Sequence, residues 1–252
     1  MKQPYLSVVI PCYNEEANLK RGVLGEVDDF LAEQKYTSEV IVSDDESSDN
    51  SLALVQNFVK THSRFRLLKN THGGKAYAVR SGIDNARGEI VLFTDMDQST
   101  PINETDKILA RFRSGADIVI GSRGRVRKNA PWFRKLMALG FLLFRRLILL
   151  PGIVDTQCGF KALKTDIARK LFPQLYIFKV NQTAKGWRVG AFDVELLYLA
   201  QKRGYRIDEV VVNWQDQDTA KTKKQKFIKE SKDMLKEILR VKLNDLRGMY
   251  QE

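Results

Sequence analysis

Two carboxylates, Asp95 and Asp97, follow the run Ile90–Thr94 with a single residue between them. Beyond the end of a strand, such a pair can share a divalent cation, one carboxylate directly and the other through water. Mg²⁺ and Mn²⁺ prefer carboxylate, water and phosphate oxygens, and a cation held there would offset the charge on a departing diphosphate. Asp-x-Asp spacing also serves in helix capping, so the pair alone leaves a structural role open.

A second set of polar residues suits a nucleotide. A carboxylate at Asp44 or Asp45 can accept hydrogen bonds from a base or a ribose, although acids before a serine pair also form turns. Tyr13 can stack on a base, and Glu15 can begin a helix. The loop 72–75, His-Gly-Gly-Lys, lets the backbone approach a ligand and places a cation near phosphate. It lacks the Walker A spacing, so a P-loop is excluded.

The elements that must position these residues alternate along the first 120 residues. Apolar, β-branched runs predict strands at Leu6–Ile10, Val40–Ser43, Phe65–Leu68, Ile90–Thr94 and Ile118–Ile120. Amphipathic stretches predict helices at Glu15–Gln34, Asn50–Thr61, Lys75–Ala86 and Asn103–Arg113. This alternation predicts an α/β fold with a mostly parallel sheet flanked by helices. Ligands bind beyond the carboxyl ends of the strands in such sheets, which is where the polar residues fall.

The second half of the chain is more basic. Residues 123–154 contain no Asp or Glu, and the mostly apolar stretch Trp132–Leu150 has the length of a helix. This helix suits a bilayer interface, or alternatively it packs in the core with one basic face. Phe160–Leu163 and Arg206–Trp214 predict two more strands, and Phe192–Arg203 predicts a helix.

The C-terminal stretch Lys221–Met249 predicts a long basic amphipathic helix or a helix pair. Its expected apolar stripe comprises Phe227, Met234, Ile238, Val241 and Leu246. The lysines at its start suit an anionic lipid surface, while packing on the core is an equal alternative.

Composition limits the possible classes of protein. The chain has 252 residues, 43% of them hydrophobic, and a net charge of +11. These values fit a globular protein and exclude disorder, collagen and fibrous coiled coils, and the positive charge favours a phosphate-bearing partner. Two cysteines exclude a disulfide scaffold. We expect no signal peptide and no transmembrane helix, because neither apolar pattern is present.

Five ordered motifs resemble the inverting, nucleotide-sugar-dependent glycosyltransferases of the GT-A fold, the large family-2 group. They read V-V-I-P-C-Y-N-E-E, I-V-S-D-D-E-S-S-D, H-G-G-K-A-Y-A-V-R-S-G, F-T-D-M-D and I-V-I-G-S-R. Three later motifs, at Asp155–Lys161, Ala191–Tyr198 and Val212–Trp214, look like the dolichyl-phosphate β-glucosyltransferase branch, close to the dolichyl-phosphate mannose synthases. The resemblance covers about residues 6 to 215 and implies a GT-A sheet with interfacial amphipathic helices.

The resemblance implies roles for the matching positions. It assigns Asp45 to the nucleotide base, Lys75 to the glycine loop, and Asp95 and Asp97 to the metal and the diphosphate. The expected metal is Mg²⁺ or Mn²⁺. The positions expected to bind the donor or cofactor are Pro11, Tyr13, Glu15, Asp45, Lys75, Asp95, Gln157 and Lys221. The positions expected to take part in catalysis are Asp97, Asp95, Arg123, Arg134, Asp193 and Glu195.

Among these, Arg123, Arg134 and Lys221 are candidates to hold an acceptor phosphate. Asp193 or Glu195 could act as a base for a hydroxyl acceptor, or could begin a helix as an N-cap and a first-turn acid.

Three positions depart from the family pattern. Glu46 replaces the glycine of D-D-G-S, where glycine usually supplies a positive φ. Ser99 stands where mannose synthases carry a glutamine as third metal ligand, and Gln98 comes one residue earlier. The G-S-K element reads Thr-Ala-Lys and keeps only Lys221.

The expected function is transfer of a hexose from UDP-glucose, or next from GDP-mannose, to a dolichyl or polyprenyl phosphate. We expect a peripheral enzyme on the cytoplasmic membrane face, with no nucleic-acid partner. One alternative is a soluble or peripheral glycosyltransferase acting on a glycan hydroxyl. The other is a basic nucleic-acid-binding protein, against which the clustered acids argue.

The expected organisation is a glycosyltransferase domain at 1–220 and a basic helical appendage at 221–252. Within the domain, residues 1–120 bind the nucleotide sugar. Residues 121–220 bind the acceptor and include the helix 132–150.

Overall fold

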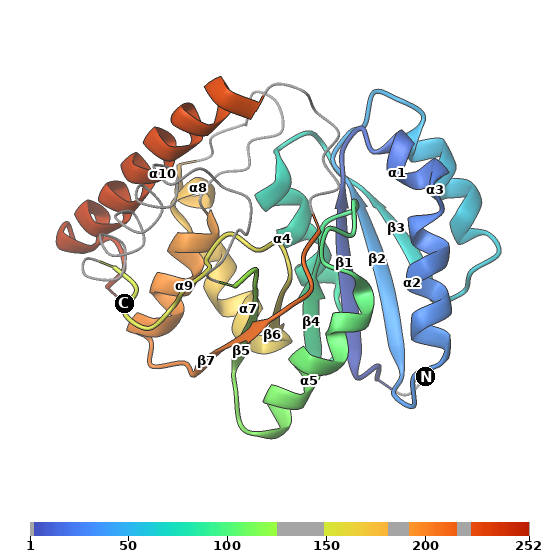
Figure 1. The fold of residues 1–252 in the computed structure, drawn as a ribbon, viewed down its shortest axis with the longest axis horizontal. Coiled ribbons are helices and arrows are strands. Elements are labelled where there is room, and N and C mark those ends of the chain that lie inside the picture. The colour runs from blue at the N-terminus through green and yellow to red at the C-terminus, as the bar shows by residue number, and fades with distance from the viewer. Residues whose placement is uncertain (1–2, 125–148, 181–191, 216–222, 252) are drawn as a thin grey trace.

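The computed structural model describes residues 3–124, 149–180, 192–215 and 223–251, with backbone only from 223 to 234. At its centre is a seven-stranded sheet in the order β3-β2-β1-β4-β6-β5-β7 (Figure 1). The strands are β1 (Leu6–Cys12), β2 (Ser38–Asp44), β3 (Phe65–Lys69), β4 (Ile90–Phe93), β5 (Ile118–Ser122), β6 (Lys161–Lys164) and β7 (Ile207–Val211). Each predicted strand is present, and the predicted mostly parallel α/β sheet is confirmed.

One strand runs against the others. β6 pairs antiparallel with β4 on one side and with β5 on the other, whereas the remaining pairings are parallel. A short apolar run does not reveal strand direction, so the sequence did not predict this reversal. The consequence is functional, because the residues just before β6 lie at the carboxyl ends of β4 and β5.

Helices cover both faces of the sheet, because its strands alternate buried side chains between two cores. Val9 of β1 packs in one core with α4 (Lys75–Asn85), α7 (Thr165–Leu171), α9 (Phe192–Lys202) and α10 (Lys223–Leu246). Val8 and Ile10 pack in the other core with α2 (Val23–Ala32), α3 (Ser51–Val59) and α5 (Thr105–Arg113). The result is a three-layer arrangement (Figure 1).

Some helices differ from the prediction. The expected helix Glu15–Gln34 is divided into α1 (Glu16–Lys20) and α2, because Gly22 takes a φ of 92° between them. The short helices α7 and α8 (Tyr176–Lys179) were not predicted, nor was the 3-10 turn η2 (Phe172–Gln174). A 3-10 turn, η1 (Ile102–Glu104), precedes α5.

Most of the predicted helix 132–150 lies outside the described residues, as do Arg134 and Lys221. The last two residues of that stretch, Leu149 and Leu150, are described and buried in the core. Among the helices of the described ranges, none combines the length and the apolar character needed to span a membrane.

Candidate active site

The predicted polar residues converge at the carboxyl edge of the sheet. The Asp45 backbone N–H donates to the carbonyl of Cys12 at the end of β1, at 2.9 Å. Thr94, just before Asp95, donates to the Val9 carbonyl of the same strand at 3.0 Å. The loops that follow β1, β2 and β4 are therefore tied together, and Pro11 is buried beneath them in β1.

Asp95 forms an ion pair with Lys75, the first residue of α4. Lys75 is buried, whereas 37% of the Asp95 side chain is exposed. Burial disfavours the charged ammonium, but the charges of Asp95, Asp193 and Asp97 outweigh it and raise the pKa of Lys75. Lys75 is therefore a permanent cation beside a partly open carboxylate.

Gly159 makes room for Asp95. A Cβ at this glycine would lie 2.0 Å from Oδ2 of Asp95, so any larger residue would displace the carboxylate. The reversed direction of β6 brings Gly159 to this place. We did not predict a role for Gly159, and its only sequence signal was its position inside the motif Asp155–Lys161.

Asp97 is held within its own loop. The Ser99 backbone N–H donates to one carboxylate oxygen at 2.8 Å, and the Ser99 hydroxyl donates to the other at 2.9 Å. Arg21 donates to the Asp97 carbonyl at 2.6 Å, and Gln98 Nε2 donates to the Asp95 carbonyl at 3.0 Å. Ser99, which stands where mannose synthases carry their third metal ligand, thus orients the Asp97 carboxylate.

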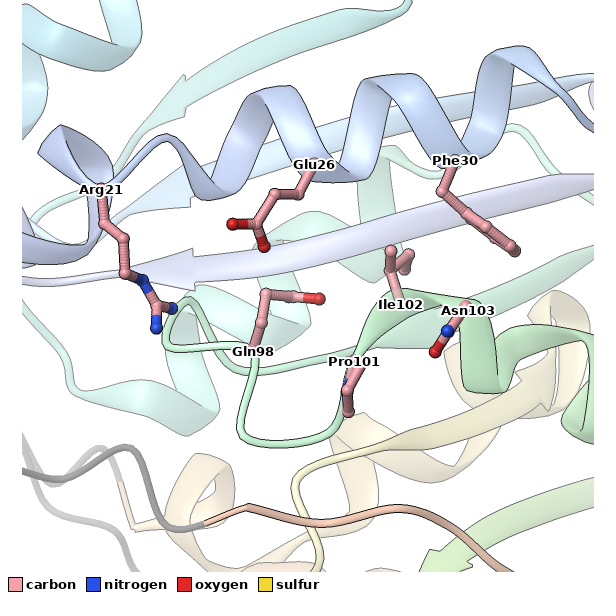
Figure 2. Close-up of a pocket in the computed structure, with 7 residues that line it drawn as sticks. All are labelled: Arg21, Glu26, Phe30, Gln98, Pro101, Ile102 and Asn103. Carbon is pink, nitrogen blue, oxygen red and sulfur yellow. The ribbon is translucent and has the colours of Figure 1, made fainter.

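A pocket of about 370 Å³ lies behind this loop. Figure 2 shows the Gln98 side chain between α2 and the segment that begins at Pro101. Oε1 of Gln98 is buried without a hydrogen-bond partner among the described residues. The lining residues are Arg21, Glu26, Phe30, Gln98, Pro101, Ile102 and Asn103. None of the predicted site residues that the structure describes lines this pocket.

Asp45 organises the glycine loop. Its fully buried carboxylate accepts hydrogen bonds from the N–H groups of Gly73 and Gly74 at 2.9 and 2.8 Å. His72 Nδ1 lies 2.9 Å from the same carboxylate, and the His72 ring stacks on Tyr13 with centroids 4.7 Å apart. The N–H groups expected to face a phosphate are therefore occupied by Asp45, and Tyr13 with His72 forms an aromatic surface beside them.

Glu46 adopts the backbone conformation that glycine usually supplies. Its φ is 61°, and its carboxylate accepts a hydrogen bond from the His72 N–H at 2.9 Å. Glu46 therefore preserves the conformation of the turn, and its side chain adds a hydrogen bond to the glycine loop.

Glu15 lies near the two aspartates. Burial raises its pKa, the hydrogen bond from Asn18 opposes this, and the charges of Asp97 and Asp95 add to the increase. Its backbone N–H donates to Ser51 Oγ at 2.7 Å, which fixes the start of α1 against α3.

Arg123, after β5, is bound by Asp155. Its Nε and Nη2 donate to the two carboxylate oxygens at 2.7 and 2.9 Å. Burial disfavours the Asp155 carboxylate, yet Arg123 holds its pKa well below the ordinary value. Glu209 of β7 accepts from the Asp155 N–H at 2.8 Å. We did not predict Glu209, because its partner is distant in sequence.

Gln157 and Asp193 also lie near the carboxyl edge of the sheet. Gln157 Nε2 is buried and has no hydrogen-bond partner among the described residues, so it can donate to a ligand. Asp193 lies in the first turn of α9, and its Oδ1 lies 2.8 Å from Nζ of the fully buried Lys161. The charge of Asp193 reaches both Lys75 and Arg123, which places it within the site's electrostatic network.

Glu195, on the same helix, has different surroundings. It is 1% exposed, and its carboxylate accepts from the Tyr250 hydroxyl and the Tyr176 N–H, both at 2.7 Å. Arg240 of α10 lies 3.4 Å away, and burial raises the pKa of Glu195 against these contacts. These partners fix Glu195 between α8, α9 and α10, apart from Asp95 and Asp97.

The donor set at Asp95 and Asp97 fits a divalent cation. Both are hard oxygen donors, and the absence of a side chain at Gly159 leaves room for the Asp95 carboxylate. Among the described residues, no group of three or more His, Cys, Asp or Glu forms a metal cage. Two carboxylates can hold a hard divalent cation that completes its coordination with water and substrate phosphates.

Comparison with known sequences gives consistent matches. Residues 7–172 match the family described as Glycosyl transferase family 2. A dolichyl-phosphate beta-glucosyltransferase of Dictyostelium discoideum is 36% identical, over 98% of this chain and 76% of the relative. The human protein with the same description is 33% identical, over 86% of this chain and 69% of its own length.

Solved structures agree in fold. A mannosyltransferase from Pyrobaculum calidifontis, in complex with GDP-Man and Mn²⁺, gives a TM-score of 0.61 at 20% identity. The match covers 93% of this chain and 63% of that one. Glucosyl-3-phosphoglycerate synthase from Mycobacterium tuberculosis, in complex with uridine diphosphate, gives a TM-score of 0.65 at 18% identity. That match covers 94% of this chain and 80% of the synthase chain.

Proposed function

The chain belongs to glycosyl transferase family 2 and has the GT-A fold, and from this premise we propose that it transfers glucose from UDP-glucose to a dolichyl or other polyprenyl phosphate. The observation that carries the proposal is the similarity to dolichyl-phosphate beta-glucosyltransferases, which extends over 98% of the chain. The described site is consistent with this chemistry, because it combines carboxylates with buried cations at one sheet edge.

The donor lies across the loops that follow β1, β2 and β4. Tyr13 and His72 offer an aromatic surface to the base, and Asp45 keeps the glycine loop in place beneath it. The diphosphate lies toward Asp95 and Asp97. Lys75 adds a buried positive charge there, because it forms an ion pair with the partly exposed Asp95.

The reaction is a displacement at the anomeric carbon. An oxygen of the acceptor phosphate forms a bond to that carbon, and the bond to the UDP oxygen breaks with its electron pair leaving on UDP. The acceptor is already anionic, so the chain has to position it and needs no general base. Gln157 Nε2 and the partly exposed Arg123 are the described groups suited to hold the phosphate. Arg134 and Lys221 are proposed for the same task from sequence.

Asp95 and Asp97 would hold a divalent cation, Mg²⁺ or Mn²⁺. A cation bound by these carboxylates supplies positive charge beside the diphosphate. The support is the oxygen donor set, the loop held by Ser99 and Arg21, and the Mn²⁺ in the complex of the Pyrobaculum mannosyltransferase.

The proposal also covers where the protein acts and which parts of the chain bind the donor, the acceptor and the lipid. The protein acts as a peripheral enzyme on the cytoplasmic face of a membrane, since a polyprenyl acceptor resides in one. Residues 1–120 bind the donor, residues 121–220 bind the acceptor, and the segment from 221 onward contacts the lipid surface.

A donor screen tests the proposal. Purified protein is incubated with Mg²⁺ or Mn²⁺, a polyprenyl phosphate in detergent, and either UDP-glucose or GDP-mannose, and the lipid-linked sugar is quantified. We expect glucosyl lipid from UDP-glucose. Mannosyl lipid from GDP-mannose alone would overturn the donor assignment. Transfer to a soluble glycan without lipid product would overturn the acceptor and favour the hydroxyl-acceptor alternative.

A further inference from the structure

Helix α10 exposes apolar side chains on the face away from the core. Among the described residues, the large apolar side chains that are exposed are Val211, Leu235, Leu239, Leu243 and Leu246. All except Val211 belong to α10. We call Leu235, Leu239, Leu243 and Leu246 the leucine face, and their exposed fractions run from 40% to 73%.

The leucine face is distinct from the face that packs. Ile238 and Val241 are fully buried in the core. With 3.6 residues per turn, the centres of the two faces lie about 125° apart around the helix. Ile238 and Val241 belong to the apolar stripe expected from sequence, and their burial agrees with the alternative that this helix packs on the core. Of that stripe, Leu246 is exposed and the side chains of Phe227 and Met234 are not described.

Basic residues flank the leucine face. Helical spacing puts Lys236 and Arg247 on one side of it and Lys242 on the other. The preceding half of the helix, 223–234, contains five lysines against one Glu and one Asp. Anionic lipid attracts such lysines. A second copy of the helix would instead bring like charges together.

We propose that the leucine face of α10 docks on an anionic bilayer surface, with the helix lying parallel to the membrane. Leucines enter the boundary between headgroups and acyl chains, while the flanking lysines contact lipid phosphates. The inference rests on the proposed function only in that a polyprenyl acceptor requires a membrane nearby. It names the surface that meets that membrane.

The test compares two double variants in flotation with vesicles that contain about 30% anionic phosphatidylglycerol. Leu239→Ser with Leu243→Ser removes the apolar contact, and Leu239→Met with Leu243→Met is the matched control that keeps it. We expect the serine variant to partition about tenfold or more weakly, and the methionine variant to match the wild type. Thermal melting should agree for all three proteins, since these side chains are exposed.

Several results would overturn the docking surface. One is a serine variant that floats as well as the wild type. Another is a wild-type dimer by light scattering that the serine variant breaks without changing flotation, because the face would then join two copies. Transfer in detergent separates this inference from the proposed function. A wild type that floats but makes no glucosyl lipid leaves the docking surface intact, whereas glucosyl lipid from a wild type that does not float overturns the docking surface alone.

Discussion

Asp97 offers a direct test at the scale of single residues. Asp97→Asn keeps an oxygen that can accept the Ser99 N–H bond but removes the charge. We expect the transfer rate to fall about 100-fold with no change in melting temperature, because the loop stays folded while its cation site is lost. Initial rates over a Mn²⁺ titration measure this, with the exposed Asp106→Asn as control. A wild-type rate at saturating Mn²⁺ would remove Asp97 from the site.

Gly159 tests whether the position of Asp95 matters. In Gly159→Ala the new Cβ would meet the end of the Asp95 side chain, which can move without disrupting the backbone. We expect the transfer rate to drop about tenfold while the free energy of unfolding changes by only about 1 kcal/mol. Gly25→Ala is the matched control, because nothing lies within 4 Å of a Cβ there. Equal rates in both variants would contradict a positioning role for Gly159.

The sequence identified the acids of the site but not their partners. Asp45, Asp95 and Asp97 follow their strands directly, so a local pattern reveals them. The contacts of Asp45 with Gly73 and of Asp95 with Gly159 join residues far apart in the chain. Such contacts depend on how the strands are ordered, and no local pattern encodes that order.

At the scale of elements, the loop before β6 is fastened to β5 through Asp155 and Arg123. The pKa of Asp155 is lower in the folded chain than in the unfolded chain, despite its burial, because Arg123 stabilises the carboxylate. The pair's contribution to stability is therefore present above about pH 4, the range of an unperturbed aspartate, and declines as the pH falls below it.

Asp155→Asn should expose that dependence. We expect the variant to lose about 3 kcal/mol of unfolding free energy at pH 7, since Arg123 is left without its partner. The difference in unfolding free energy between the variant and the wild type should become smaller below about pH 4. Urea unfolding at several pH values measures it, with Asp29→Asn, an exposed carboxylate on α2, as the control. A difference that stays constant with pH would contradict the assigned pair.

Element type was predictable where the apolar pattern was strong, and element direction was not. All the strands were predicted from short apolar runs, but the reversal of β6 depends on its two neighbours, β4 and β5. The break between α1 and α2 at Gly22 was also missed. A glycine inside an amphipathic pattern marks a break only when the chain takes a positive φ there, as it does at Gly22.

For the whole molecule, α10 joins the last part of the chain to the core. Ile238, Val241 and Tyr250 are buried with residues of the sheet, and Tyr250 donates to Glu195. Deleting residues 222–252 would therefore remove core side chains together with any lipid contact. Loss of vesicle binding after such a deletion would not distinguish docking from unfolding, so single substitutions on opposite faces are needed.

Two neighbouring residues provide that comparison. Ile238 is fully buried and Leu239 is 44% exposed. We expect Ile238→Ala to lower the free energy of unfolding by about 3 kcal/mol, because it leaves a cavity against the sheet. Leu239→Ala should change it by less than about 0.5 kcal/mol, since surface substitutions cost little. Urea unfolding measures both, and flotation of each folded variant then reports lipid contact separately. Equal destabilisation by the two substitutions would mean that Leu239 also packs against the protein. Weaker flotation of Leu239→Ala would then not show that a lipid contact had been removed.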